Sequence, residues 1–240
     1  MGNLLALGDI PLLFMTVPLT ALSVAGLCNA YNMIDGIDGL AAASACLPLL
    51  VLYALALGSG HPQAAALLPV LVASAIFLLF NLGRGTRWRP RVFLGDSGSV
   101  TLGFLVTVAL VYFSQVPNAL IEPVTALWLV ALPLMDMLST MLNRYVRGRP
   151  LMTADRSHVH HILIDRGLTA RKALGILAAW STLCALAGLA LEAVPSYLSL
   201  LVYCGLFIGH CLFVLNAGSV VPRASSGGAG MSAETLQDKA

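Results

Sequence analysis

Charged side chains are scarce in this sequence. Only 10% of its 240 residues are Asp, Glu, Lys or Arg, whereas 58% are hydrophobic. An ordinary soluble domain carries about 25% charged residues. No Lys or Arg precedes Arg84, and no charge of either sign lies between Gly39 and Gly83. The composition excludes a soluble domain and predicts an all-α integral membrane protein.

Three further absences narrow the class. No basic residue precedes the first apolar run, so the N-terminus does not resemble a cleaved signal peptide. Residue 6 is Ala rather than Ser or Thr, which excludes the pattern for N-myristoylation. The cysteines lie in apolar runs without metal-type spacing, so they resemble small hydrophobic residues rather than a disulfide framework. They are Cys28, Cys46, Cys184, Cys204 and Cys211.

Apolar runs and turns alternate along the chain and predict about seven transmembrane helices. A span needs about 20 mostly apolar residues. We predict one transmembrane domain over residues 1–216, with spans near 10–31, 40–57, 63–82, 98–115, 123–143, 172–191 and 196–216. Residues 217–240 are rich in Gly, Ser and Ala, which predicts a disordered tail. The sequence shows no internal repeat.

The basic residues are concentrated in two loops. Eleven of the thirteen Lys and Arg residues lie in the loops 84–97 and 144–171 or at their edge. The loops around His61, Pro117 and Glu192 have none. The positive-inside rule therefore makes the two basic loops cytoplasmic. Counting spans puts the tail and the polar turn after the first span on the same side, so the polar clusters share one face of the membrane.

The first polar cluster is NAYNMIDGIDGLAA, residues 29–42. Asp35 and Asp38 are each followed by a glycine, and helical spacing would make Asn32 a neighbour of Asp35. Two carboxylates at this spacing repel, and Mg²⁺ held by one or two carboxylates plus substrate phosphates would supply the missing charge. The glycines let a phosphorylated ligand approach the backbone closely. The alternative is a Gly- and Asp-rich turn that merely ends a membrane helix.

The second cluster is FLGDSGS, residues 93–99, at the start of the fourth span. Helix N-termini attract phosphate through free N–H groups and the helix dipole, although Asp96 could also be an ordinary helix cap. An anionic ligand is favoured by Asn81 and by four arginines just upstream, some of which only reach to lipid headgroups. These arginines are Arg84, Arg87, Arg89 and Arg91.

The third cluster is DRSHVHH, residues 155–161, and contains three of the five histidines. Three histidines could hold zinc, but no cysteine lies near them and a three-histidine site needs a matched geometry. Imidazoles that bind phosphate oxygens fit the acidic, Gly-rich clusters better. Asp155 and Arg156 could instead form a surface ion pair worth at most about 1 kcal/mol.

Taken together, these motifs resemble the polyprenyl-phosphate N-acetylhexosamine-1-phosphate transferases. The segments that carry the resemblance are NAYNMIDGIDGLAA, Asn81 with FLGDSGS, PVTALWLVALPLMDM at 123–137, and DRSHVHH followed by GLTARKA. The match is strongest to the bacterial undecaprenyl-phosphate GlcNAc-1-phosphate branch and extends to about residue 200. We therefore expect the polytopic helical fold of that family, with cytoplasmic catalytic loops.

The resemblance implies a reaction, a cofactor and a location. The donor would be UDP-N-acetylglucosamine or a related UDP-N-acetylhexosamine, and the acceptor undecaprenyl phosphate in the lipid bilayer. The products would be UMP and a lipid-linked pyrophosphoryl sugar, made with Mg²⁺ or Mn²⁺ in the first membrane step of a cell-envelope polysaccharide. The protein would lie in the bacterial inner membrane with a cytoplasmic active site. We expect no nucleic-acid partner, and a homodimer remains open.

The resemblance also implies roles for individual residues. The catalytic candidates are Asp35, Asp38, Asp96, His158, His160 and His161. The substrate-binding candidates are Asn29, Asn32, Asn81 and Arg156. The metal ligands would come from Asp96, Asn32 and Asp35. Asp136 lies inside a span, where a carboxylate is costly, so either a functional role or a structural hydrogen bond is expected.

The chain also departs from the family pattern. Family members have ten or eleven spans and an Asp-Asp motif in an early cytoplasmic loop, whereas this chain has about seven spans and no adjacent Asp pair. It resembles the C-terminal two-thirds of such an enzyme. We therefore expect residues 1–240 alone to bind a donor weakly without releasing UMP. A non-catalytic remnant is one alternative. A transporter fragment is another, although it would place charges near the bilayer midplane.

Overall fold

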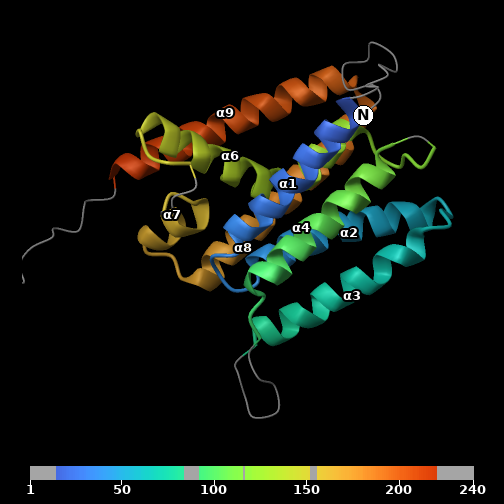
Figure 1. The fold of residues 1–240 in the computed structure, drawn as a ribbon, viewed down its shortest axis with the longest axis horizontal. Helices are drawn as coiled ribbons and strands as arrows, with labels where there is room; N and C mark the ends of the chain where they lie inside the picture. Colours follow the sequence, from blue (N-terminus) through green and yellow to red (C-terminus); the bar gives the residue numbers. More distant parts are fainter. Residues whose placement is uncertain (1–14, 84–91, 116, 152–155, 221–240) are drawn as a thin grey trace, which may run out of the picture.

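The computed structural model describes residues 15–83, 92–115, 117–151 and 156–220. In these ranges every regular element is a helix, and the predicted all-α class is confirmed (Figure 1). The elements are α1 (Thr16–Ile34), α2 (Leu40–Gly58), α3 (Ala64–Asn81), α4 (Gly95–Phe113), α5 (Pro123–Leu129), α6 (Ala131–Val146), α7 (Val159–Asp165), α8 (Ala170–Ala190), the 3₁₀ helix η2 (Leu191–Ala193) and α9 (Ser196–Val220).

Six of the described helices are long and apolar enough to cross a membrane, and the bent pair α5–α6 makes a seventh if it counts as one span. This agrees with the expectation of about seven spans. The start of the predicted first span, residues 10–14, lies outside the described residues. At the other end α9 runs to Val220, into the stretch predicted as a tail, and residues 221–240 also lie outside the described part.

In the structure the predicted span over 123–143 is divided into α5 and α6, which meet at Val130 with a bend of 78°. The cause is Pro133, in the first turn of α6. A proline ring clashes with the carbonyl four residues earlier. Here that carbonyl belongs to Leu129, the last residue of α5. The short helix α7 in the second basic loop was also not predicted.

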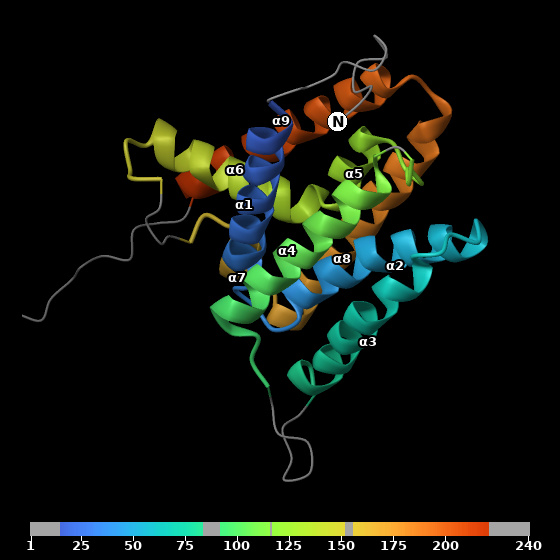
Figure 2. The same ribbon diagram turned by 45° about the vertical axis from the view of Figure 1, so that its right-hand side comes forward.

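Two glycines allow neighbouring helices to pack closely. A Cβ added to Gly103 of α4 would lie 2.8 Å from the Leu27 carbonyl oxygen of α1. A Cβ on Gly188 of α8 would lie 2.3 Å from the Trp128 Cβ of α5. Figures 1 and 2 show α1 beside α4, with the α2–α3 hairpin along one side and α3 at its edge. These contacts fix which helix ends lie together.

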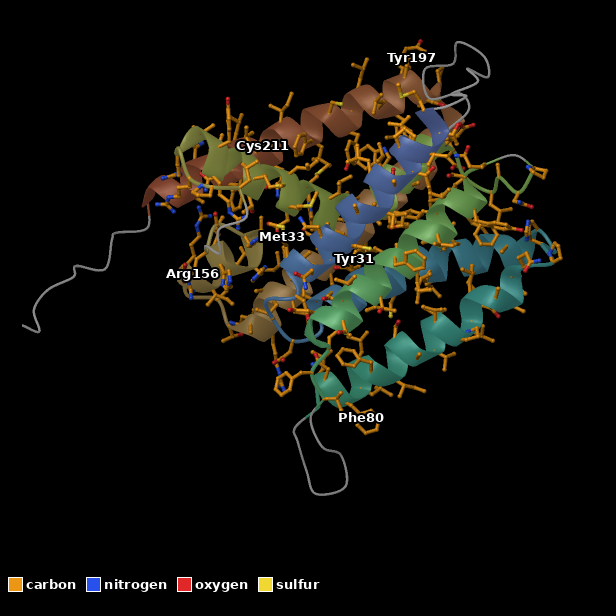
Figure 3. The ribbon with its side chains drawn as sticks, in the orientation of Figure 1. Tyr31, Met33, Phe80, Arg156, Tyr197 and Cys211 are labelled. Atoms are coloured by element: carbon orange, nitrogen blue, oxygen red, sulfur yellow. The ribbon has the colours of Figure 1, made fainter. Side chains whose placement is uncertain are left out.

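One end of the bundle gathers the polar clusters. The 35–39 turn, the C-terminus of α3 and the first turn of α4 meet there, and α7 packs against α8 and α9. The opposite end has a different chemistry. There Glu192 accepts a hydrogen bond from the Glu122 N–H at 3.0 Å, and the His61 ring lies edge-on to Phe113. Figure 3 shows Arg156 near the first end and Tyr197 near the second.

Candidate active site

The acidic turn between α1 and α2 is tight and depends on its glycines. Asp35 caps the C-terminus of α1, and the Gly36 N–H donates to the Ile34 carbonyl at 2.8 Å. Gly39 starts α2 with a φ of 80°, a conformation that favours glycine. A Cβ at Gly39 would also lie 2.7 Å from the Leu82 Cδ2. The turn therefore fits closely under the end of α3.

The first and second clusters meet through a side-chain hydrogen bond. The Asn32 Nδ2 of α1 donates to the Asp96 Oδ1 at 3.3 Å and to the Ser99 Oγ at 3.2 Å. Asp96 lies in the first turn of α4 and is exposed, while Ser99 is buried behind it. Residues 64 positions apart in the sequence thus form one polar patch. In this arrangement Asn32 orients the Asp96 carboxylate with its amide nitrogen.

The two carboxylates of this patch affect each other. Burial raises the pKa of Asp35, and the negative charge of Asp96 raises it further. Asp38 lies half-buried in the same turn. The Asp35 and Asp96 carboxylates therefore repel each other, and a cation between them would relieve that repulsion.

The three histidines of the third cluster lie together at the start of α7. His160 is only 1% exposed. The His158 ring stacks on it with centroids 5.6 Å apart, and the His161 ring is tilted against it with centroids 4.3 Å apart. A Cβ added to Gly36 would lie 2.0 Å from the His160 Nε2. The histidine helix therefore packs directly on the acidic turn.

Two of the three histidines have a lower pKa than a free imidazole. Burial lowers the pKa of His160 to about 4, although the nearby Asp136 charge opposes this shift. Burial and the Arg156 charge lower the pKa of His161. Neither ring nitrogen of His160 has a hydrogen-bond partner in the described part of the chain. The His160 ring is thus neutral at pH 7 and buried, and His161 is the more accessible of the two. The catalytic role predicted for His160 stays a prediction.

Arg156 points outward from this end of the molecule. Its guanidinium donates to Asp165 at the far end of α7, with 2.6 Å between Nη2 and Oδ1, and its side chain is 63% exposed. The alternative partner Asp155 lies outside the described residues. The pair brings a cation next to the histidines, which suits an anionic ligand.

Asn29 and Asn81 make contacts outside the group formed by the acidic turn, Asp96 and α7. The Asn29 Nδ2 lies 3.2 Å from the Met33 sulfur and 3.3 Å from the Met137 sulfur of α6. The Asn81 Nδ2 donates to the Val92 carbonyl at 2.8 Å, which closes the connection between α3 and α4. Within the described residues these contacts give both amides a packing role. Their proposed contact with substrate stays a prediction.

The structure also identifies a residue whose role the sequence left undecided. The Asp136 Oδ1 accepts the Val159 N–H and its Oδ2 lies near the His158 Nδ1, both at 2.8 Å. The sequence signal was a lone carboxylate inside a predicted span. Its partners could not be found from the pattern, because they lie more than twenty positions later in another element.

The described residues contain no group of three or more His, Cys, Asp or Glu arranged to hold a metal ion. The zinc alternative for the three histidines therefore gains no support in the described residues. Mg²⁺ requires less from the protein, because it keeps waters and binds through one or two carboxylates plus substrate phosphates. Asp35 and Asp96 supply that number of carboxylates at one place. The donor set fits Mg²⁺ together with a phosphorylated ligand.

The fold and the site define a polytopic membrane protein with an acidic and histidine-rich centre at one end of its helices. Residues 1–114 match the family model described as glycosyl transferase family 4. The chain is similar to this family over that range, and the predicted resemblance is confirmed.

Three similar proteins share one enzyme name. A Yersinia pestis protein is 35% identical over 199 residues, which cover 80% of this chain and 54% of the relative. Proteins of Escherichia coli K12 and Salmonella typhi are 34% and 33% identical, each over 200 residues that cover 81% of this chain and 54% of the relative. All three are named undecaprenyl-phosphate alpha-N-acetylglucosaminyl 1-phosphate transferase. The chain spans about half the length of the curated relatives it matches.

Proposed function

We propose that this chain carries the centre of an N-acetylhexosamine-1-phosphate transferase, with UDP-N-acetylglucosamine as donor and undecaprenyl phosphate as acceptor. The names of the relatives support this choice. The observation that carries it is the packing of the histidine helix α7 on the acidic turn, next to Asp96. Cations and imidazoles opposite carboxylates, at one end of apolar helices, suit a reaction between two phosphorylated substrates.

Asp35 and Asp96 would hold Mg²⁺ or Mn²⁺, with Asn32 orienting the Asp96 carboxylate and Asp38 adding negative charge from the same turn. A bound divalent ion would neutralise the donor pyrophosphate and polarise its phosphorus–oxygen bonds. The raised pKa of Asp35 supports this assignment, because a cation relieves the repulsion that causes part of the shift. The exposure of Asp96 leaves it accessible to a ligand.

His161 and Arg156 would meet the phosphate groups, and His158 and His160 would hold α7 in place beside them. An acceptor phosphate oxygen attacks the sugar-linked phosphorus of the donor, the bond to the UMP oxygen breaks, and UMP leaves. Such transfers depend on positioning and on stabilising negative charge. The side chains at this end of the protein offer both functions without requiring a protein nucleophile.

An apolar cavity of about 530 Å³ lies between α1, α4, α5 and α6. Leu27, Leu110, Leu127 and Met137 are among its lining residues. Met137 also contacts Asn29, one turn of α1 before Asn32, whereas Thr16 and Gln115 line the cavity toward the opposite end of the helices. We assign it to the polyprenyl tail of the acceptor, whose phosphate would then reach the cytoplasmic end.

An assay of the transfer tests this function. Membranes containing the chain, alone or co-expressed with the N-terminal segment of the Escherichia coli relative, receive labelled UDP-N-acetylglucosamine, undecaprenyl phosphate and Mg²⁺. With the N-terminal segment present, we expect UMP and a lipid-linked sugar, and Asp96→Asn in this chain should reduce their formation by at least about 100-fold. The proposal would be overturned if neither arm showed a transfer that depends on Asp96.

A further inference from the structure

A buried carboxylate beside the histidines has no part in the transfer scheme above. Asp136 is 1% exposed within α6, and a carboxylate buried without partners is costly. We propose that Asp136 is a positioning residue that fixes the ring tautomer of His158 and docks α7 on the acidic turn. The consequence for turnover rests on the proposed function, whereas the tautomer does not.

The geometry defines the protonation of the His158 ring. An ionised carboxylate only accepts hydrogen bonds. The distance of 2.8 Å between the Asp136 Oδ2 and the His158 Nδ1 therefore places a proton on Nδ1. In the neutral ring the lone pair then lies on Nε2. The Thr140 hydroxyl, one turn further along α6, lies 3.4 Å from the same Nδ1 and borders the ring.

Asp136 also holds the start of α7. Val159 is the first residue of that helix, and the first N–H groups of a helix have no partner within it. The Asp136 Oδ1 accepts the Val159 N–H from a neighbouring element at 2.8 Å. His158, the preceding residue, has extended backbone and makes no cap hydrogen bond with its side chain. One carboxylate therefore fixes both the helix start and the adjacent ring.

A short row of contacts links this carboxylate to the acidic turn. His158 stacks on His160 with an angle of 13° between the rings. His160 packs against Gly36, where there is no room for a Cβ. Gly36 follows Asp35 in the turn. A change in the orientation of His158 would therefore shift His160 and, through it, the turn that carries Asp35.

The competing interpretation is a hydrogen bond that only stabilises the fold. Asp136→Asn separates the two, because asparagine has nearly the same size and its Oδ1 can still accept the Val159 N–H. Its Nδ2 would face the His158 Nδ1 as a donor and force the proton to Nε2. The same exchange beside a histidine of a catalytic triad inverts the tautomer and leaves the geometry intact.

The first experiment measures the tautomer of the His158 ring by ¹⁵N NMR. The sample is residues 1–240 in lipid nanodiscs, with ¹⁵N-labelled histidine at pH 7. The His158 signal is assigned by its loss in His158→Gln. We expect a protonated Nδ1 in the wild type and an unprotonated Nδ1 with a protonated Nε2 in Asp136→Asn. An unprotonated Nδ1 in the wild type, or the same tautomer in both proteins, would overturn the proposal. The wild-type spectrum alone decides if the variant fails to fold.

The second experiment measures transfer of the sugar phosphate in membranes that contain this chain together with the N-terminal segment of the Escherichia coli relative. Asp136→Asn should lower kcat by about 10- to 100-fold, as partners that orient a histidine typically do, with the KM for the UDP-sugar within about threefold. Ser139→Ala is the matched control, because this equally buried hydroxyl of α6 donates to the Asp136 carbonyl of its own helix and to no other group in the described part of the chain. It should leave kcat unchanged. The double variant Asp136→Asn/His158→Gln should be no slower than His158→Gln.

The two measurements separate the two claims. Fully additive losses in the double variant, or unchanged kcat in Asp136→Asn, would refute the positioning role. A wild type without transfer would refute the proposed function, while the tautomer would still decide the role of Asp136.

Discussion

At the scale of single residues, the site depends on a glycine that the motif places between its two acids. Gly36 has no side chain, so the turn and the His160 ring are in direct contact. Because the backbone of Gly36 does not adopt a positive φ, the main obstacle to alanine is this ring, which supplies the three atoms nearest to the added Cβ. The glycine therefore serves close approach rather than backbone freedom.

Gly36→Ala should lower the stability of the protein by about 1–3 kcal/mol, the usual cost of overpacking. Thermal unfolding in nanodiscs measures the change. Gly26→Ala in α1 is the control, because a Cβ there meets nothing within 4 Å. The cost should shrink sharply when His160→Ala is present in the background. Equal stability of the Gly36 and Gly26 variants would mean that α7 does not rest on the turn.

At the scale of elements, the sequence predicted the polar ends of the helices better than their paths. Motifs at the ends of two spans predicted that Asn32 and Asp96 lie at the same end of the helices, because apolar runs force polar side chains to the interface. The hydrogen bond between them was not predicted. The bend at Val130 was missed, since the apolar pattern runs through it and only Pro133 marks the break. The partners of Asn29 and Asp136 were also missed. They depend on α6 crossing α1 and α7, which no local pattern encodes.

The docking of α7 should depend on pH through His160. Its pKa is about 4 in the folded protein and about 6.5 when exposed. The unfolded state thus binds more protons between these values, so the stabilisation is complete above about pH 6.5 and is lost as the pH falls toward 4. The loss should reach up to about 3 kcal/mol.

Hydrogen exchange of the α7 amides, corrected for intrinsic rates, measures this effect at pH 7 and pH 4.5. We expect faster exchange at the lower pH in the wild type and a much smaller difference in His160→Gln. His161→Gln is the control, because this ring is less buried. Equal protection of α7 at both pH values in the wild type would show that His160 carries no such dependence.

At the scale of the whole molecule, the polar ends of α1, α3, α4 and α7 lie together at one end of the helices. The two basic loops of the sequence are connected to these same helix ends. We infer that this end is cytoplasmic, by the positive-inside rule. Asp35 and Asp96 lie at the ends of α1 and α4 rather than in their middles, which differs from the midplane position expected of a transporter.

Single cysteines in a cysteine-free background test this orientation. In right-side-out vesicles, an impermeant thiol reagent should label Ser59→Cys and Asn118→Cys at once, and Arg149→Cys only after the membrane is opened. The reason is that the first two lie in turns without Lys or Arg, whereas the third lies in a basic loop. The reverse pattern of protection would place the candidate site outside the cell.

We infer that the acidic turn, Asp96 and α7 form one Mg²⁺-dependent site for a UDP-sugar. The most direct test of this inference is the binding of UDP-N-acetylglucosamine to residues 1–240 in nanodiscs, titrated with and without Mg²⁺. We predict weak binding that requires Mg²⁺ and weakens by at least about tenfold in Asp96→Asn, with Ser139→Ala matching the wild type. Binding that is equally strong in EDTA and in Asp96→Asn would contradict the account.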